Sequence, residues 1–293
     1  MDNQELKRNA IKLRRGILRS THAAASGHPG GSLSATELFT LLYFEELQVD
    51  PKNPDDPKRD RFVLSKGHCA PGLYAALAAR GFFPEEDLLT LRHIGSYLQG
   101  HPDMKHIPGV DMSSGSLGQG ISAAVGMALA AKIYDDSYRT YALLGDGEIE
   151  EGEVWEAAML AGFRKLDNLV VIVDNNNLQI DGHVTDVCSL GDIDEKFRSF
   201  GWNVLRVNGH EVTEVRQALL AARDGREAGN TAPTVIICQT VKGKGVSFME
   251  DKASWHGNAP SAEQADLARE ELDAARELLL IDLQGEGKEV ANV

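Results

Sequence analysis

The chain has 293 residues, of which 42% are hydrophobic and 25% are charged, as in ordinary soluble globular proteins. Its formal net charge of −14 argues against nonspecific binding to nucleic acid or to anionic lipid. Three cysteines without metal-ligand spacing argue against a disulfide framework and a structural zinc site. We find no signal-like segment and no apolar stretch of the roughly 18 residues that a membrane span needs, so we expect a cytoplasmic protein.

Helical and strand-like segments alternate along the chain. We expect helices at about 4–25, 34–47, 70–80, 84–92, 121–134, 155–165, 212–223 and 261–283, and strands at 61–65, 140–144, 169–173, 203–207 and 234–239. This order predicts an α/β fold with a mainly parallel sheet flanked by helices. We expect one domain over 1–293, with a core at about 5–260, a terminal helix at 261–283 and a tail at 284–293.

Polar segments follow two of the expected strands, where the carboxyl ends of parallel strands commonly bind ligands. Gly145-Asp146-Gly147 follows one strand, and Asp174-Asn175-Asn176-Asn177 follows another. One helix and one strand separate Asp146 from Asn176, which returns the chain to the same edge of the sheet. A carboxylate and an amide oxygen there suit a hard cation such as Mg²⁺, although an Asp-Gly turn alone is common.

The spacing of these two segments resembles the thiamine diphosphate motif. The resemblance implies that Asp146, Asn176 and the main-chain carbonyl of Leu178 hold Mg²⁺ on the cofactor's diphosphate. Further segments resemble the transketolase family in family order over roughly residues 5–260: 26–31 (SGHPGG), 65–68 (SKGH), 100–103 (GHPD), 115–120 (GSLGQG) and 255–257 (WHG). Only the diphosphate-binding half of a full-length transketolase is matched, so we expect the N-terminal subunit of a split enzyme with a thiamine diphosphate-binding fold.

The resemblance also implies catalytic roles for four loop histidines. His28 and His256 are expected to contact the sugar, His68 and His256 to lie near the diphosphate, and His101 to bind the ketol end of the donor. Each is a histidine in a Gly- or Pro-containing loop, which taken alone is usually a surface residue. We expect the other five histidines to be structural or surface residues. The residues expected to bind the cofactor are His68, Gly115, Ser116, Leu117, Gly147, Glu151, Asn176, Ile180 and His256.

The resemblance implies more specific roles for the loop 115–117 and for Glu151. The loop 115–117 is expected to meet the aminopyrimidine, although many family members have proline at the position of Ser116. Glu151 matches a glutamate in a network that links paired active sites, while a helix-terminal acid explains it equally well. We do not assign a role to Lys242 and Lys244, because a solvated loop explains them as well as a phosphate site does.

The expected reaction transfers a two-carbon ketol unit from a ketose phosphate to an aldose phosphate, as in the pentose phosphate pathway. The glutamate that activates the cofactor lies on a pyrimidine-binding domain, and no segment of this chain resembles that domain. We therefore expect a partner chain, the C-terminal subunit, and assembly into a dimer of heterodimers, that is, a heterotetramer. Alternatives are a subunit of 1-deoxyxylulose-5-phosphate synthase, of a 2-oxo-acid dehydrogenase or of a transketolase for an unusual sugar phosphate, and a non-catalytic scaffold that keeps the fold.

Overall fold

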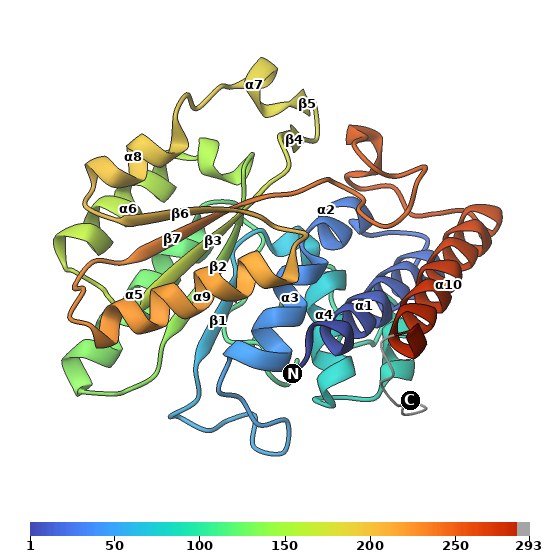
Figure 1. Cartoon of the computed structure of the whole chain (residues 1–293), viewed down its shortest axis with the longest axis horizontal. Coiled ribbons are helices and arrows are strands. Elements are labelled where there is room, and N and C mark those ends of the chain that lie inside the picture. Colours follow the sequence, from blue (N-terminus) through green and yellow to red (C-terminus); the bar gives the residue numbers. More distant parts are fainter. Residues whose placement is uncertain (286–293) are drawn as a thin grey trace.

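The computed structural model describes residues 1–285 and is built around one parallel sheet (Figure 1). Its strands are β1 (Arg61–Leu64), β2 (Thr140–Gly145), β3 (Leu169–Asn175), β6 (Asn203–Asn208) and β7 (Thr234–Gln239), in the order β1-β2-β3-β7-β6. All four pairings are parallel. Six of the seven residues of β3 are buried, including its whole apolar run, as expected for a central strand covered on both faces. The predicted fold class is confirmed.

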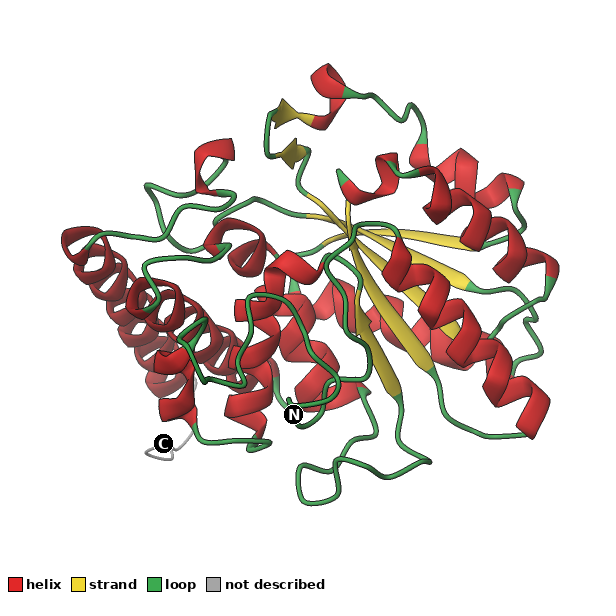
Figure 2. Cartoon of the chain, turned by 180° about the vertical axis from the view of Figure 1, so that it is seen from behind, coloured by secondary structure: helices red, strands yellow, loops and turns green. Residues whose placement is uncertain are grey.

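Helices cover both faces of the sheet (Figure 2). One apolar cluster includes side chains of α1 (Asn3–Ala23), α3 (Thr36–Leu41), α4 (Ala70–Arg80) and α9 (Val212–Glu227) with alternate residues of the strands. The other includes side chains of α5 (Gln119–Tyr134), α6 (Gly152–Phe163) and α8 (Ile193–Ser199) with the intervening strand residues. The alternation is visible on β3, where Val170 and Ile172 join the first cluster while Val171 and Val173 join the second.

Shorter elements complete the chain. These are α2 (Pro29–Ser34), η1 (Leu42–Glu46), η2 (Gly67–Cys69), η3 (Glu85–Thr90), η4 (Glu148–Glu150), β4 (Leu178–Gln179), β5 (Gly182–His183), α7 (Val184–Val187) and η5 (Ala253–Trp255). The long terminal helix α10 (Ala262–Gly285) packs beside α1. Among the described residues, no helix is long and apolar enough to cross a membrane.

The expected helix at 34–47 begins instead at Pro29 and is broken into α2, α3 and the π-helix η1. A proline is compatible with the first turn of a helix, because the nitrogen there has no intrahelical acceptor. Gly30 and Gly31 continue that turn because they allow close packing. A Cβ on Gly30 would lie 2.6 Å from the carbonyl oxygen of Trp255, and one on Gly31 would lie 2.7 Å from Cys69 Sγ. The expected tail 286–293 lies outside the described residues.

Candidate active site

Four loop histidines meet in one cluster above the carboxyl ends of the strands. The His68 and His256 rings stack with centroids 5.0 Å apart, and His28 approaches them edge-on at 5.2 and 5.3 Å. His101 lies 6.4 Å from His28, measured between ring centroids. These side chains come from four segments that are distant in the sequence, so chance proximity of surface residues does not explain the arrangement.

The environment keeps these imidazoles neutral. Burial, assisted by nearby cationic groups, lowers the pKa of His28 to about 4 and that of His256 to about 3. Burial also lowers the pKa values of His68 and His101. Neutral imidazoles can accept as well as donate protons at pH 7. The His28 Nδ1 atom is buried and has no hydrogen-bond partner among the described residues, which leaves a polar atom available for a bound molecule.

A carboxylate site lies at the ends of β2 and β3. Asp146 is buried and accepts hydrogen bonds from the Gly147 and Asn177 backbone N–H groups and from the Asn175 side chain. Burial and the neighbouring Asp174 raise the pKa of Asp146 to about 6. Asp174 is neutralised by an ion pair with Lys66, whereas Asp146 has no ion pair to a described residue. A cation beside Asp146 would offset this buried negative charge.

The loop after β3 supplies two further oxygens of the kind that bind a hard cation. Asn176 donates from its side-chain nitrogen to Ser34 Oγ, and its Oδ1 accepts from the Leu178 N–H group. The Leu178 carbonyl accepts from Lys242 Nζ at 2.7 Å. The donor set of Asp146, Asn176 Oδ1 and the Leu178 carbonyl is thus chemically suited to Mg²⁺, which prefers oxygen ligands and retains several waters. Among described residues, no group of three His, Cys, Asp or Glu side chains forms a metal cage.

Two buried lysines lie between the histidine cluster and this carboxylate site. Lys66 is almost fully buried and pairs with Asp174, whose charge raises the pKa of the lysine above its ordinary value. Lys242 is also buried, and its Nζ lies 3.2 Å from His256 Nδ1. The sequence alone assigns Lys242 no role. A glycine-rich loop is typical of a solvated segment, and only the fold reveals that Lys242 points inward.

A buried network holds the loop that carries Lys242. Arg14 donates to Glu37 Oε1 at 2.6 Å and to the Lys244 carbonyl at 2.9 Å. The other oxygen of Glu37 lies 3.0 Å from His210 Nδ1, and His210 Nε2 accepts from the Val241 N–H group at 2.8 Å. This acceptor role places the imidazole proton on Nδ1, where it faces the carboxylate. His210, expected to be structural, therefore positions the Lys242 loop.

Contacts of the structure describe the surroundings of Gly115, Ser116 and Gly147 among the remaining cofactor-binding candidates. Gly115 has a φ of +150°, and a Cβ there would lie 2.9 Å from the His101 ring. Gly115 and Ser116 line a small cavity with Gln119 and Gly120. At Gly147 a Cβ would lie 2.8 Å from the Gln179 side chain. The structure gives Leu117 and Glu151 no contact that assigns them a cofactor role.

Ile180 is 65% exposed although it is apolar, and it follows β4 directly in the sequence.

Glu148, which the sequence does not mark as a candidate, is buried and accepts hydrogen bonds from three groups. It accepts from Ser65 Oγ and from the backbone N–H groups of Gly118 and Gly145, which ties the loops of the site together. The sequence offers no signal for Glu148 beyond its place after Gly147.

The family model for the transketolase thiamine diphosphate-binding domain matches residues 7–280. The chain belongs to this family. The family's cofactor is thiamine diphosphate with a divalent metal ion, and its members are transketolases. The buried Asp146 carboxylate has no ion pair to a described residue and His28 Nδ1 has no hydrogen-bond partner among these residues, and both groups fit such a cofactor and metal.

Relatives of two lengths are similar to the chain. It is 43% identical over 95% of its length to one of the subunits of the apulose-4-phosphate transketolase of Phocaeicola vulgatus, of which it covers 98%. It is 45% identical over 92% of its length to the 6-deoxy-6-sulfo-D-fructose transketolase subunit SqwG of a Clostridium species, of which it covers 96%. By contrast, it covers only 40% of the Rattus norvegicus transketolase, to which it is 46% identical.

The chain likewise covers only part of the solved structures to which it is similar. The transketolase from Campylobacter jejuni superposes with a TM-score of 0.86 at 33% identity over 95% of this chain, but the chain covers only 46% of that structure. The chain thus spans less than half the length of the full-length transketolases that it matches. It corresponds in length to the relatives named as separate subunits.

We predict that His210→Ala weakens thiamine diphosphate binding about tenfold in the presence of Mg²⁺, because the Val241 N–H group and Glu37 each lose a partner and the Lys242 loop loosens. Titration calorimetry of the purified chain measures this effect. His106→Ala is the control, since His106 is exposed and bonded only to Asp103 among the contacts described. Equal cofactor affinity in both variants would contradict the positioning role.

A second prediction concerns pH. The folded-state pKa of His28 lies below the unfolded value of about 6.5, so this group favours folding above pH 6.5 and loses that contribution as pH falls toward 4. His28→Gln should therefore reduce the loss of unfolding free energy between pH 7 and pH 5 in the cofactor-free chain. Urea denaturation at the two pH values tests this, and an unchanged pH dependence would show that His28 is not held neutral.

Proposed function

We propose that the chain is the diphosphate-binding subunit of a two-chain transketolase that moves a two-carbon ketol unit from a ketose phosphate to an aldose phosphate. The observation that carries the proposal is the meeting of the four loop histidines with Asp146, Asn176 and the Leu178 carbonyl at one edge of the sheet. A non-catalytic scaffold would not need these side chains to be kept together at one place.

The proposed cofactor site divides the work among these groups. Asp146, Asn176 Oδ1 and the Leu178 carbonyl would hold Mg²⁺, while Lys242 and His68 would face the diphosphate. In the structure Lys242 Nζ donates a hydrogen bond to the Leu178 carbonyl, and it would donate to the diphosphate when the cofactor is bound. Gly115, Ser116, Leu117 and Ile180 would contact the organic part of the cofactor, and Gly147 would allow its close approach. When bound, thiamine diphosphate supplies the carbanion chemistry that breaks and forms the carbon–carbon bond.

The protein groups bind the sugar and move protons. His28 and His256 have low pKa values, so each is neutral at pH 7 and can accept a proton from a sugar hydroxyl. His101 lies at the rim of the cluster, where it would hydrogen-bond the ketol end of the donor. Because His28 Nδ1 has no hydrogen-bond partner in the described part of the chain, it can bond a substrate oxygen without giving up a contact seen there.

The separate-subunit relatives and the coverage of less than half of full-length transketolases support an enzyme of two different chains. A large apolar surface on α5 and α6 supports further assembly. Ile133, Tyr134, Met159 and Phe163 are each more than half exposed, although apolar side chains of this size favour burial. We propose a dimer of heterodimers in which this surface is covered. Glu151, at the start of α6, would then take part in a network between paired sites.

The substrate is proposed only to the level of a phosphorylated sugar. The named relatives are a subunit of an apulose-4-phosphate transketolase and a subunit of a 6-deoxy-6-sulfo-D-fructose transketolase, so one name specifies a phosphorylated sugar and the other a sulfo sugar. An alternative is therefore a transketolase for an unusual sugar. We further propose that the protein is cytoplasmic and that its reaction with xylulose 5-phosphate belongs to the pentose phosphate pathway.

The test is reconstitution. The chain, its partner subunit, thiamine diphosphate and Mg²⁺ should together convert xylulose 5-phosphate and ribose 5-phosphate. A coupled assay detects the triose phosphate that this reaction releases. We expect no activity from either chain alone. Ketol transfer by this chain alone would overturn the two-chain proposal, and turnover of only an unusual sugar would redirect the substrate assignment.

Asp146→Asn tests the metal site. Loss of one charged ligand should weaken Mg²⁺-dependent binding of thiamine diphosphate at least tenfold while the circular dichroism spectrum stays unchanged. Asp181→Asn is the matched control, since Asp181 is an exposed carboxylate on the neighbouring turn. Unchanged cofactor binding in the Asp146 variant would refute its assignment as a ligand.

A further inference from the structure

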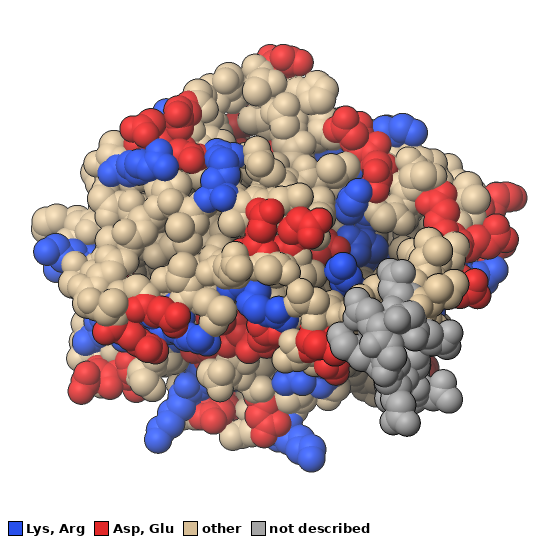
Figure 3. Space-filling model, viewed as in Figure 1, with Lys and Arg blue, Asp and Glu red and all other residues tan. Residues whose placement is uncertain are grey.

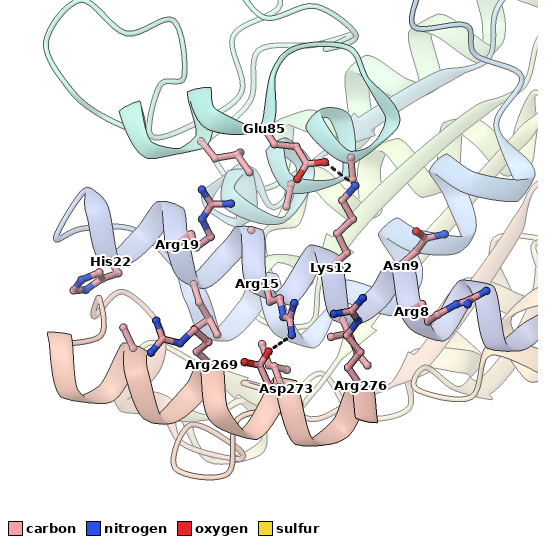
Figure 4. Close-up of a pocket in the computed structure, with 18 of the residues that line it drawn as sticks. Arg8, Asn9, Lys12, Arg15, Arg19, His22, Glu85, Arg269, Asp273 and Arg276 are labelled. Atoms are coloured by element: carbon pink, nitrogen blue, oxygen red, sulfur yellow. Dashed lines mark hydrogen bonds and ion pairs between the residues drawn. The ribbon is translucent and has the colours of Figure 1, made fainter. Parts of the chain in front are cut away.

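A second cavity lies away from the histidine cluster, between α1, α10 and the α4–η3 segment. Its volume is about 930 Å³, which is within the range of pockets that hold small organic ligands. Figure 4 shows side chains from α1 and from α10 pointing toward one another across it. None of the residues assigned above to the cofactor or the sugar lines this cavity.

The lining is basic in a protein that is acidic as a whole. Among the described residues, six Lys and Arg side chains and four Asp and Glu side chains line the cavity, whereas the full chain has 30 of the former and 44 of the latter. Figure 3 shows basic and acidic side chains interspersed over the face in view. The six cations are Arg8, Lys12, Arg15, Arg19, Arg269 and Arg276.

The helical spacing explains why these cations converge. Arg8, Lys12, Arg15 and Arg19 recur at intervals of three or four residues, which places them on one face of α1. On α10, Arg269 and Arg276 are seven residues apart and likewise share a face. The two basic faces border the same cavity because α10 packs beside α1.

Carboxylates of the lining pair with at least three of these cations. Arg15 pairs with Asp273 and Lys12 with Glu85, as the dashed lines in Figure 4 show, and Arg269 pairs with Asp266. The Arg15 Nε atom is nevertheless buried without a hydrogen-bond acceptor among the described residues. Burial and the charge of Arg276 both lower the pKa of Arg15, so the two guanidinium groups are close enough to repel each other. An anion between them would supply the missing acceptor and relieve the repulsion.

The rest of the lining is apolar. Leu18, Leu88 and Leu272 are buried side chains along the cavity, and Ile11 is half-buried beside them. Guanidinium groups match the geometry of phosphate oxygens, while the leucines would pack against an uncharged organic body. A simple inorganic ion would leave both the apolar wall and most of the volume unused.

We propose that this cavity is a second binding site, distinct from the active site, for a phosphorylated organic molecule of nucleotide size. Arg15, Arg269 and Arg276 bind the phosphate groups, and the apolar wall of Leu18, Leu88 and Leu272 holds the organic body. The bound anion bridges α1 and α10. These helices adjoin the loops that carry His28 and His256, since α1 ends at Ala23 and α10 begins at Ala262.

The experiment titrates the chain with ATP and, separately, with tripolyphosphate by calorimetry. Both titrations are done without divalent metal, because the proposed diphosphate site of the active site requires Mg²⁺, and binding there would not respond to the cavity variants. Arg269→Gln and Arg276→Gln leave the Arg15–Asp273 ion pair in place and are compared with Arg223→Gln, which removes the same charge from α9, outside the cavity lining. ¹H–¹⁵N spectra report the Arg15 Nε–H signal, which is assigned by its loss in Arg15→Lys.

We expect each cavity variant to weaken ATP binding about tenfold, because each removes a charge-assisted hydrogen bond, and we expect Arg223→Gln to change it less than twofold. ATP should shift the Arg15 Nε–H signal and bind more tightly than tripolyphosphate. Equal affinities in the cavity and control variants, or no measurable ATP binding, would overturn the proposal. Equal binding of tripolyphosphate and ATP would overturn the role of the apolar wall.

Discussion

The structure of the site depends on the burial of charge at the carboxyl ends of β2 and β3. Asp146 and Asp174 are both buried there, and of the two only Asp174 has a cationic partner among the described residues, Lys66. Burial raises the pKa of Asp146 to about 6, and the neighbouring Asp174 carboxylate adds to this effect because two carboxylates disfavour each other's ionised state. The site is therefore electrostatically incomplete as a protein alone. A divalent cation at Asp146 would complete it and would hold the diphosphate of the cofactor at the sheet edge.

The surrounding residues serve this arrangement. Ser34 and Thr240 donate hydrogen bonds to Asp174, so the carboxylate that is not a proposed ligand is fixed by two hydroxyl groups as well as by Lys66. Glu148 joins the segments at 65, 118 and 145, and Glu37 joins Arg14 to His210. Removal of one partner from such a buried network costs more than a surface contact does, because the remaining group stays desolvated.

Much of this could be predicted from the sequence. The apolar run at 169–173 and the alternation of helices and strands gave the parallel sheet, and the positions of Asp146 and Asn176 after two strands placed them at one edge. The family resemblance predicted that His28, His68, His101 and His256 serve one site, and their rings lie close together in the fold. Lys242, His210 and Glu148 could not be found in this way, because their roles depend on burial and on partners 30 to 64 residues distant in the chain. The breaks in the 29–46 helical segment were missed because close backbone packing, not periodicity, decides them.

The central claim is that this chain holds the diphosphate end of the cofactor through a cation at Asp146 and needs a second chain for catalysis. Calorimetric titration with thiamine diphosphate, with and without Mg²⁺, measures the first part on the purified chain most directly. The account predicts binding that requires Mg²⁺ and that is lost in Asp146→Asn but kept in Asp181→Asn. Metal-independent binding of equal strength, unaffected by the Asp146 substitution, would contradict it.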